Sequence, residues 1–364
     1  MILHLYFARK FVLSFLSVLG IFFAILVLVD LVEQVRRFSS DAFTFGAALR
    51  LTLLNVPALL YRIFPLIMIL ATLTLFLGLA RTSELVVTRA SGRSALKSLL
   101  APVLVAALFG ACAVAILNPM VAATSKQYEI QSNRFASGNT NVLSISQEGL
   151  WLRQGSKSGQ TVIRASRANL DGTRLFDVTF ITFAPNEGPT ERIEAKSADL
   201  IKGLWRLQDA KRWSFAGTNP ELTATTSATL DIPTDLTRAG IRDSFGTPSA
   251  IPIWELPQFI DSLETAGFSA RQHRMWFQME LALPLFLVSM VLVGAAFTLR
   301  HTRFGRTGAM VLAALLTGFA LYFIRNFAQI LGENGQIPIA LAAWTPPLAA
   351  IGLALGLLLH LEDG

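Results

Sequence analysis

The chain has 364 residues, of which 53% are hydrophobic and 15% charged, and its mean hydropathy is +0.53. This composition excludes an ordinary soluble protein, so lipid must cover part of the surface. The net charge of +7 does not indicate a nucleic-acid binder. Residues 121–270 hold 15 basic and 16 acidic residues, so the positive excess lies in or beside the apolar segments. Basic residues at such positions are typical of membrane topology signals and of contacts with lipid headgroups.

Six uncharged apolar runs are each long enough to cross a hydrocarbon core of about 30 Å, which needs roughly 20 helical residues. They form two groups of three, at 11–29, 63–80 and 98–125, and at 281–299, 307–324 and 334–361. The first run is longer than the apolar part of a signal peptide and no A-x-A site follows it, so we interpret it as a retained anchor. The second apolar region begins near Leu51 and is interrupted by Pro57, Arg62 and Pro65, which predicts a long helix whose outer end protrudes or kinks.

The loop after the second run, residues 81–93, predicts a short helix at about 82–92. Ser83 is a suitable N-cap, Leu85, Val86 and Val87 form an apolar patch, and Gly92 ends the segment. Such a helix either lies on the membrane surface or docks a soluble partner.

Residues 121–270 change from helical to alternating periodicity. Short strands are expected at 141–146, 150–153, 161–165, 175–183, 192–201, 205–207, 212–215 and 224–232, with turn residues between them. About eight strands suggest a sandwich, a jelly roll or an open barrel. Phe176, Val178 and Phe180 give one strand an apolar face, which is either core or a surface that receives lipid chains. A helix with an apolar stripe is expected at 253–266.

The distribution of Lys and Arg predicts the orientation in the membrane. With a cytoplasmic N-terminus, the short inside segments hold nine basic residues and the short outside loops hold three, which are Arg36, Arg37 and Arg50. The positive-inside rule therefore places both termini in the cytoplasm and residues 121–270 outside.

Several ionisable side chains lie at the outer ends of the apolar runs. Arg36 and Arg37 follow the first run, and a guanidinium offers paired donors suited to phosphate, although snorkelling to the interface is an alternative. Arg62 and Arg325 lie within or at the edge of apolar runs and need neutralisation, by phosphate, by snorkelling or by pairing, with Glu280 as a candidate partner.

Sequence motifs for catalysis are absent. The chain has no G-x-x-x-x-G-K-[ST], H-E-x-x-H or G-x-S-x-G. Its single cysteine, Cys112, and its scattered histidines give no sign of a disulfide or metal site. We therefore expect that this chain binds no cofactor and has no enzymatic activity. The alternative is a membrane enzyme that acts on lipids.

Several motifs resemble those of the lipopolysaccharide-export permeases of the LptF/LptG type. These are residues 83–87 with 90–92 after the second run, 30–37 closing the first run, 149–151 opening a strand, and 335–338 before the last run. The resemblance covers nearly the whole chain, and residues 361–364 are more similar to the G-type subunit. It implies six transmembrane helices at 1–120 and 271–364 and an inserted, jelly-roll-like periplasmic β-domain at 121–270.

The resemblance also implies a function and partners. The family extracts lipopolysaccharide from the outer leaflet of the inner membrane of a Gram-negative bacterium and passes it to a periplasmic bridge. A related LptF-type permease, two LptB-type cytoplasmic ATPase subunits that bind ATP and Mg²⁺, and a single-span LptC-type protein complete the complex. Chemistry would then lie in the ATPase and not in this chain.

The resemblance assigns roles to particular residues. Glu84 would contact a basic residue of the ATPase, with Ser83, Leu85, Val86 and Arg89 in the same coupling helix. The alternative for Glu84 is a solvated carboxylate near the positive end of the helix dipole. Arg36 and Arg37 match paired basic residues that bind lipid A phosphates, and Arg62 and Arg325 lie at a similar depth. Asp30 stands where some relatives carry a basic residue, so a headgroup site here is not purely cationic unless Asp30 pairs with one of the arginines.

A function of another class remains open. The chain is then a membrane-anchored envelope sensor or structural protein whose β-domain binds a ligand. That alternative predicts no ATPase partner, so co-purification from membranes separates the two.

Overall fold

The computed structural model describes residues 2–38, 44–84, 87–88, 95–135, 142–146, 149–156, 159–169, 172–184, 188–215, 219–234, 236–237, 247–265, 269–299 and 307–363. They form two compact units, which are described separately below. The helical unit comprises Met1–Phe135, Ile251–Trp254 and Arg274–Gly364, and the sheet unit comprises Ala136–Ala250 and Glu255–His273.

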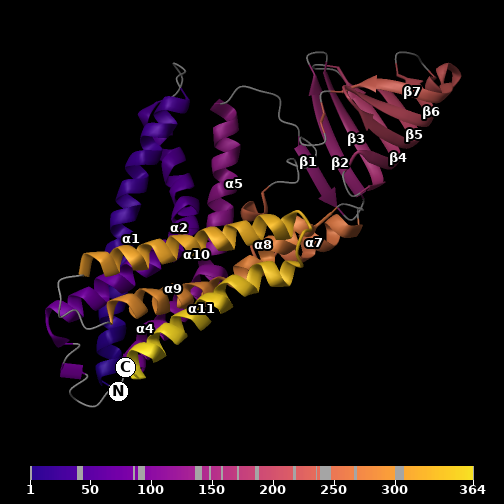
Figure 1. Ribbon diagram of the computed structural model, residues 1–364. Helices are drawn as coiled ribbons and strands as arrows, with labels where there is room; N and C mark the ends of the chain where they lie inside the picture. The colour runs from indigo at the N-terminus through magenta and orange to yellow at the C-terminus, as the bar shows by residue number, and fades with distance from the viewer. Residues whose placement is uncertain are drawn as a thin grey trace. The chain divides into compact units, whose positions relative to one another are not determined.

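The helical unit contains the membrane spans (Figure 1). Within the described residues, five stretches of helix are long and apolar enough to cross a bilayer. They are α1 (Ile2–Arg37), α2 (Phe45–Arg81), the third span built from α4 (Ala95–Cys112), the π-helical turn η1 (Ala113–Leu117) and α5 (Asn118–Phe135), then α10 (Thr307–Glu333) and α11 (Ile339–Asp363). The helices α8 (Arg271–Leu281) and α9 (Leu283–Thr298) meet the same criterion together but are bent by 48°. The expected six spans therefore require this bent pair to count as one.

Local sequence explains the limits of α2. Thr44 is its N-cap, with an extended backbone and a hydroxyl that accepts from the N–H of Ala47 at 3.3 Å. The helix starts six residues before Leu51, and it continues through Pro57 and Pro65. In the third span, α5 remains helical to Phe135, beyond the boundary at residue 121 that composition suggested.

Helix α9 lies at the centre of the helical unit, where it packs against α2, α4, α10 and α11. Most of its side chains are buried, including Leu287, Met290, Val291 and Ala295. Lipid is as apolar as these side chains, so close packing between backbones must hold the helices together. Gly110 of α4 supplies one such approach, because a Cβ there would lie 2.4 Å from the Cα of Pro284.

Within its described residues, the sheet unit forms one antiparallel sheet whose seven strands are neighbours in sequence order (Figure 1). The strands are β1 (Val142–Ser146), β2 (Gly149–Ser156), β3 (Gly159–Ala168), β4 (Arg174–Phe183), β5 (Pro189–Ile201), β6 (Leu204–Ser214) and β7 (Thr225–Pro233). Two 3₁₀ turns, η2 (Pro220–Thr223) and η3 (Pro248–Ala250), accompany it. The expected all-β insertion in a helical membrane protein is confirmed.

One strand prediction was wrong. The segments expected at 205–207 and 212–215 belong to the single strand β6, because the polar residues between them do not interrupt it. Asp209 has a positive φ of 53°, so Gln208 and Asp209 both face outward while Leu207 and Ala210 stay buried. This irregularity hides the strand from a search for strict alternation.

The same effect corrects the predicted apolar face of β4. Asp177 has a φ of 50°, so Phe176 and Asp177 both turn away from the core that Leu175, Val178 and Phe180 enter. Phe176 instead lies against the guanidinium groups of two arginines on the other face. Phe176 therefore does not share a face with Val178 and Phe180.

The helix expected at 253–266 begins later than predicted. Helix α7 (Leu256–Thr265) starts after a turn at 253–255, and its first hydrogen bond runs from the N–H of Phe259 to the carbonyl of Glu255. Pro257 suits this position because the first turn of a helix does not use its N–H groups. Trp254 thus lies outside the helix, and Leu256, Ile260 and Leu263 make up its buried stripe.

Candidate functional site

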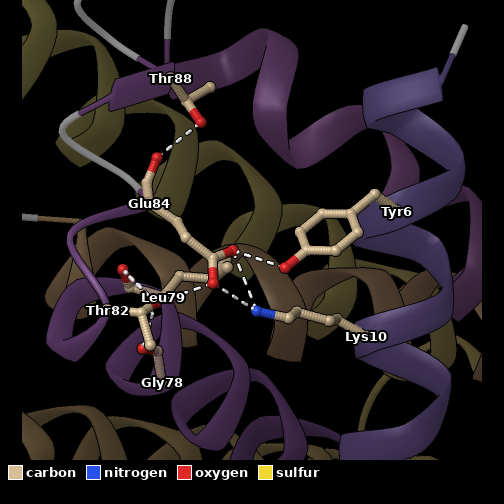
Figure 2. A network of polar contacts seen from close by, with 7 residues as sticks. All are labelled: Tyr6, Lys10, Gly78, Leu79, Thr82, Glu84 and Thr88. Atoms are coloured by element: carbon tan, nitrogen blue, oxygen red, sulfur yellow. Dashed lines mark hydrogen bonds and ion pairs between the residues drawn. The ribbon is translucent and has the colours of Figure 1, made fainter.

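The strongest polar cluster outside the membrane core joins the turn after α2 to the first turns of α1 (Figure 2). The carboxylate of Glu84 accepts from Lys10 Nζ at 2.7 and 2.9 Å and from the Tyr6 hydroxyl at 2.8 Å. Thr82 adds a third donor at 2.9 Å. These four side chains form the Glu84 cluster.

The end of α2 places Glu84 in this position. Thr82 caps the helix, and its backbone N–H donates to carbonyl groups of the last turn. Ser83 then adopts a φ of 58°, a left-handed conformation that reverses the chain direction after a helix. The carbonyl of Ser83 accepts from the N–H of Val87 at 3.2 Å, and the carbonyl of Glu84 accepts from the hydroxyl of Thr88 at 2.7 Å. A new helical turn therefore begins at Ser83, through its carbonyl group.

The Glu84 cluster keeps its carboxylate ionised. The hydrogen bond from Lys10 is the main cause that lowers the pKa of Glu84, and those from Tyr6 and Thr82 act in the same direction against desolvation. The Glu84 side chain is still 30% exposed. It can therefore meet a cation from another protein while it remains bonded to α1.

The described part of the segment predicted to couple to an ATPase is short. It includes Ser83 and Glu84, whereas Leu85, Val86 and Arg89 lie outside the described residues. Sequence reasoning missed Tyr6 and Lys10, because Lys10 was counted only as a topology signal. Their spacing of four residues, which puts them on one helix face, was the available clue.

The two arginines that end α1 are exposed. Arg36 pairs with Glu33 one turn earlier at 2.9 Å, and the guanidinium of Arg37 lies over the ring of Phe38 at 5.3 Å to the centroid. Among the residues described, no carboxylate lies within ion-pair distance of Arg37. Its charge is therefore available to an anion.

Asp30 is buried and does not pair with either arginine. Its carboxylate accepts from the amide of Asn55 at 2.7 Å and from that of Gln34 at 3.3 and 3.4 Å. Gln34 also donates to the Tyr128 hydroxyl at 3.0 Å. Asp30 thus belongs to a hydrogen-bonded cluster between α1, α2 and α5, separate from the exposed guanidinium groups.

The other two arginines differ from each other. Arg62 is exposed on α2. Arg325 is half-buried, lies over the ring of Phe286 at 5.2 Å and experiences the electrostatic attraction of Glu280, which is buried and accepts from the Tyr61 hydroxyl. The structure therefore places Arg325 near its candidate partner without an ion pair between them, and it leaves Arg62 on the surface.

In the sheet unit, Val178 and Phe180 are buried. Phe180 packs edge-on against Trp205, with ring centroids 6.4 Å apart. Both residues face the apolar interior of the sheet unit, and Phe176 does not.

Comparison with known proteins now identifies the family. The family described as lipopolysaccharide export system permease LptF/LptG matches residues 5–360. The chain belongs to this family.

Curated relatives agree with this membership. The chain is 24% identical over 363 residues to the lipopolysaccharide export system permease protein LptG of Haemophilus influenzae, covering 95% of this chain and 97% of the relative. It is also 24% identical over 336 residues to LptG of Escherichia coli (strain K12), covering 92% and 91%. These relatives are permease subunits. The chain, as a member of the family, is a multi-pass inner-membrane protein with a β-domain.

Proposed function

We propose that this chain is a permease subunit of an ATP-driven complex that extracts lipopolysaccharide from the outer leaflet of the inner membrane and delivers it to a periplasmic bridge. A related permease, an ATPase dimer and a single-span protein would be its partners. Both termini would be cytoplasmic and the sheet unit periplasmic, as the distribution of Lys and Arg favours.

The observation that carries this proposal is the Glu84 cluster. A permease without a nucleotide site must receive movement from another polypeptide through a point that is both exposed and fixed to its own helices. Glu84 is ionised and partly exposed, and Lys10 and Tyr6 bond it directly to the first span. A force on this carboxylate would therefore reach α1 as well as α2.

The outer arginines support an anionic substrate. Arg37 has a guanidinium without a carboxylate partner in the described chain, and Arg36 shares its charge only with an exposed glutamate. Phosphate competes well for such groups, because paired N–H donors match its oxygens. We assign Arg36 and Arg37 to headgroup contact, Arg62 to the same role at a deeper position, and Arg325 to electrostatic balance of the buried Glu280.

The sheet unit would shield lipid chains from water. At about 0.8 kcal/mol per CH₂, exposing one chain of a dozen carbons costs on the order of 10 kcal/mol. Val178 and Phe180 face an apolar interior that could cover such a chain.

The decisive experiment uses the purified complex in proteoliposomes. Glu84→Ala is expected to lower ATPase association and ATP-dependent lipopolysaccharide release together, because it removes the contact point. The matched control is Glu333→Gln, which alters a carboxylate bonded only locally, to Gln329. Unchanged association and release in Glu84→Ala would reject the coupling role.

Two further measurements test the substrate and the orientation. The double variant Arg36→Asp and Arg37→Asp should keep ATP hydrolysis but lose release, and normal release would reject headgroup contact. For orientation, Cys112→Ala removes the sole cysteine, and Ser214→Cys then places one in β6. An impermeant maleimide should label it from the periplasmic side of spheroplasts, and labelling only after lysis would contradict the topology.

A further inference from the structure

The third span is interrupted by a π-helical turn that its sequence explains. Pro119 has no backbone N–H, so in an α-helix the carbonyl four residues earlier, that of Ala115, would lack its donor. From Ala113 to Leu117 the backbone is π-helical instead, and the N–H of Asn118 bonds to the carbonyl of Ala113, five residues back. Such turns often mark functional positions inside long helices.

The residues that this turn exposes bind the segment Ile251–Trp254. The indole N–H of Trp254 donates to the carbonyl of Ala115 at 3.2 Å, and the N–H of Ile253 donates to Oδ1 of Asn118 at 2.9 Å. Ile253 is buried. These four residues form what we call the re-entry contact, since the chain here returns from the last strand to the helical unit.

Both hydrogen bonds have a physical reason to persist. In hydrocarbon, an unsatisfied backbone carbonyl or N–H costs several kcal/mol. The Trp254 indole donates to the Ala115 carbonyl, for which Pro119 has no N–H. The side-chain oxygen of Asn118 accepts from the N–H of Ile253, which lies in a segment that is not helical. Trp254 remains 68% exposed, so its indole group is held by this bond more than by packing.

Asn118 also connects this contact to both groups of helices. Asn118 is buried, and Tyr61 of α2 and Glu280 of α8 lie near its amide group. Glu280 is 2% exposed and in turn attracts Arg325 of α10. The re-entry contact therefore lies beside side chains from helices of both the first and the second group.

We propose that Asn118 and Trp254 are positioning residues that fix the segment Ile251–Trp254 to the transmembrane helices, so that helix movement is passed to the connection with the sheet unit. The transport consequence rests on the proposed function, whereas the contact itself does not. Loss of the contact would leave ATP hydrolysis intact and lower the lipid released per ATP.

Hydrogen exchange tests the contact without any assumption about transport. In the wild-type complex the Ile253 amide should be protected, and Asn118→Leu should speed its exchange by roughly threefold to tenfold, the factor that one net hydrogen bond represents. Thr74→Val, which removes a hydroxyl bonded only to its own helix, is the matched control. An unprotected Ile253 amide in the wild type, or equal exchange in Asn118→Leu, would overturn the proposal.

Trp254→Phe tests the consequence for transport. The change keeps the ring and removes the donor at an exposed position, so it should fold even if Asn118→Leu does not. We expect unchanged ATP hydrolysis and about threefold less lipid released per ATP, as a typical interhelical hydrogen bond would give. Trp213→Phe, which removes an indole donor to Glu221 in the sheet unit, should have no effect.

The two failures can be told apart. A wild-type complex that moves no lipopolysaccharide would reject the proposed function, while Ile253 exchange would still report on the contact. Normal release per ATP in Trp254→Phe, in a complex whose wild type is active, would reject the positioning role alone.

Discussion

Gly110→Ala should separate two helices that hold the membrane unit together. The added Cβ would lie 2.4 Å from the Cα, 2.8 Å from the Cβ and 3.2 Å from the nitrogen of Pro284. Carbon atoms pack at about 3.5 to 4.0 Å, so α4 and α9 must part by about 1 Å. The clash involves backbone atoms of a proline, so no rotamer change can relieve it.

The expected cost of this substitution is about 1 to 3 kcal/mol, the usual range for overpacking. Thermal unfolding of the purified protein in detergent measures it as a lower midpoint. Gly20→Ala is the matched control, since nothing lies within 4 Å of its added Cβ on α1, and Ala is the better helix former. A Gly110→Ala protein as stable as Gly20→Ala would refute the close approach of α4 and α9.

Three other substitutions test separate parts of the fold. The pKa of Glu84 is lowered from 4.5, so its bond to Lys10 contributes stability above that pH, and this stability is lost as the pH falls through the lowered pKa. Lys10→Met should therefore increase the mobility of a spin label at Val87 at pH 7. At a pH where the Glu84 carboxylate is protonated, the label should have the same mobility in the variant and in the wild type. Asp177→Val should destabilise β4 by about 1 to 2 kcal/mol, because a branched side chain disfavours a positive φ, whereas Asp177→Gly should not destabilise it. Hydrogen exchange of the β4 amides compares the two variants, and equal exchange rates would contradict the strained backbone. Glu280→Ala should cost about 1 to 3 kcal/mol, because it leaves the Tyr61 hydroxyl without its acceptor and removes a negative charge near Arg325. Adding Arg325→Met should restore part of the thermal midpoint. A double variant as unstable as the single one would disprove the electrostatic link between Glu280 and Arg325.

The positions of the membrane helices followed from composition, because a long apolar run has few alternatives to a spanning helix. The ends of those helices did not, since they depend on caps and polar turns. The hydroxyl of Thr44 starts α2 well before its apolar part, and Thr82 with the left-handed Ser83 ends it. Charge counting gave Lys10 a topological role, and only the fold shows that it bonds to Glu84, 74 residues away.

In the sheet unit, periodicity predicted the strands and failed where the backbone departs from the regular pleat. A residue with positive φ shifts the alternation by one position, so Phe176 faces away from Val178 and Phe180, and Leu175 enters the core in its place. Asp is one of the few side chains that tolerate this conformation. Asp177 in β4 and Asp209 in β6 were therefore the available signals.

Polar side chains inside the spans posed the harder problem. The cost of an ionisable group in hydrocarbon predicts that Glu280 and Arg325 need partners, but it does not say which ones, because the rotation of each helix is set by packing against its neighbours. Pro119 gives a more specific indication. Because it has no backbone N–H, the carbonyl group of Ala115 needs a hydrogen-bond donor from elsewhere. That donor is Trp254, 139 residues along the chain. The sequence therefore indicates which backbone groups of a membrane helix lack a partner within that helix, and the fold determines which side chains supply the missing hydrogen bonds.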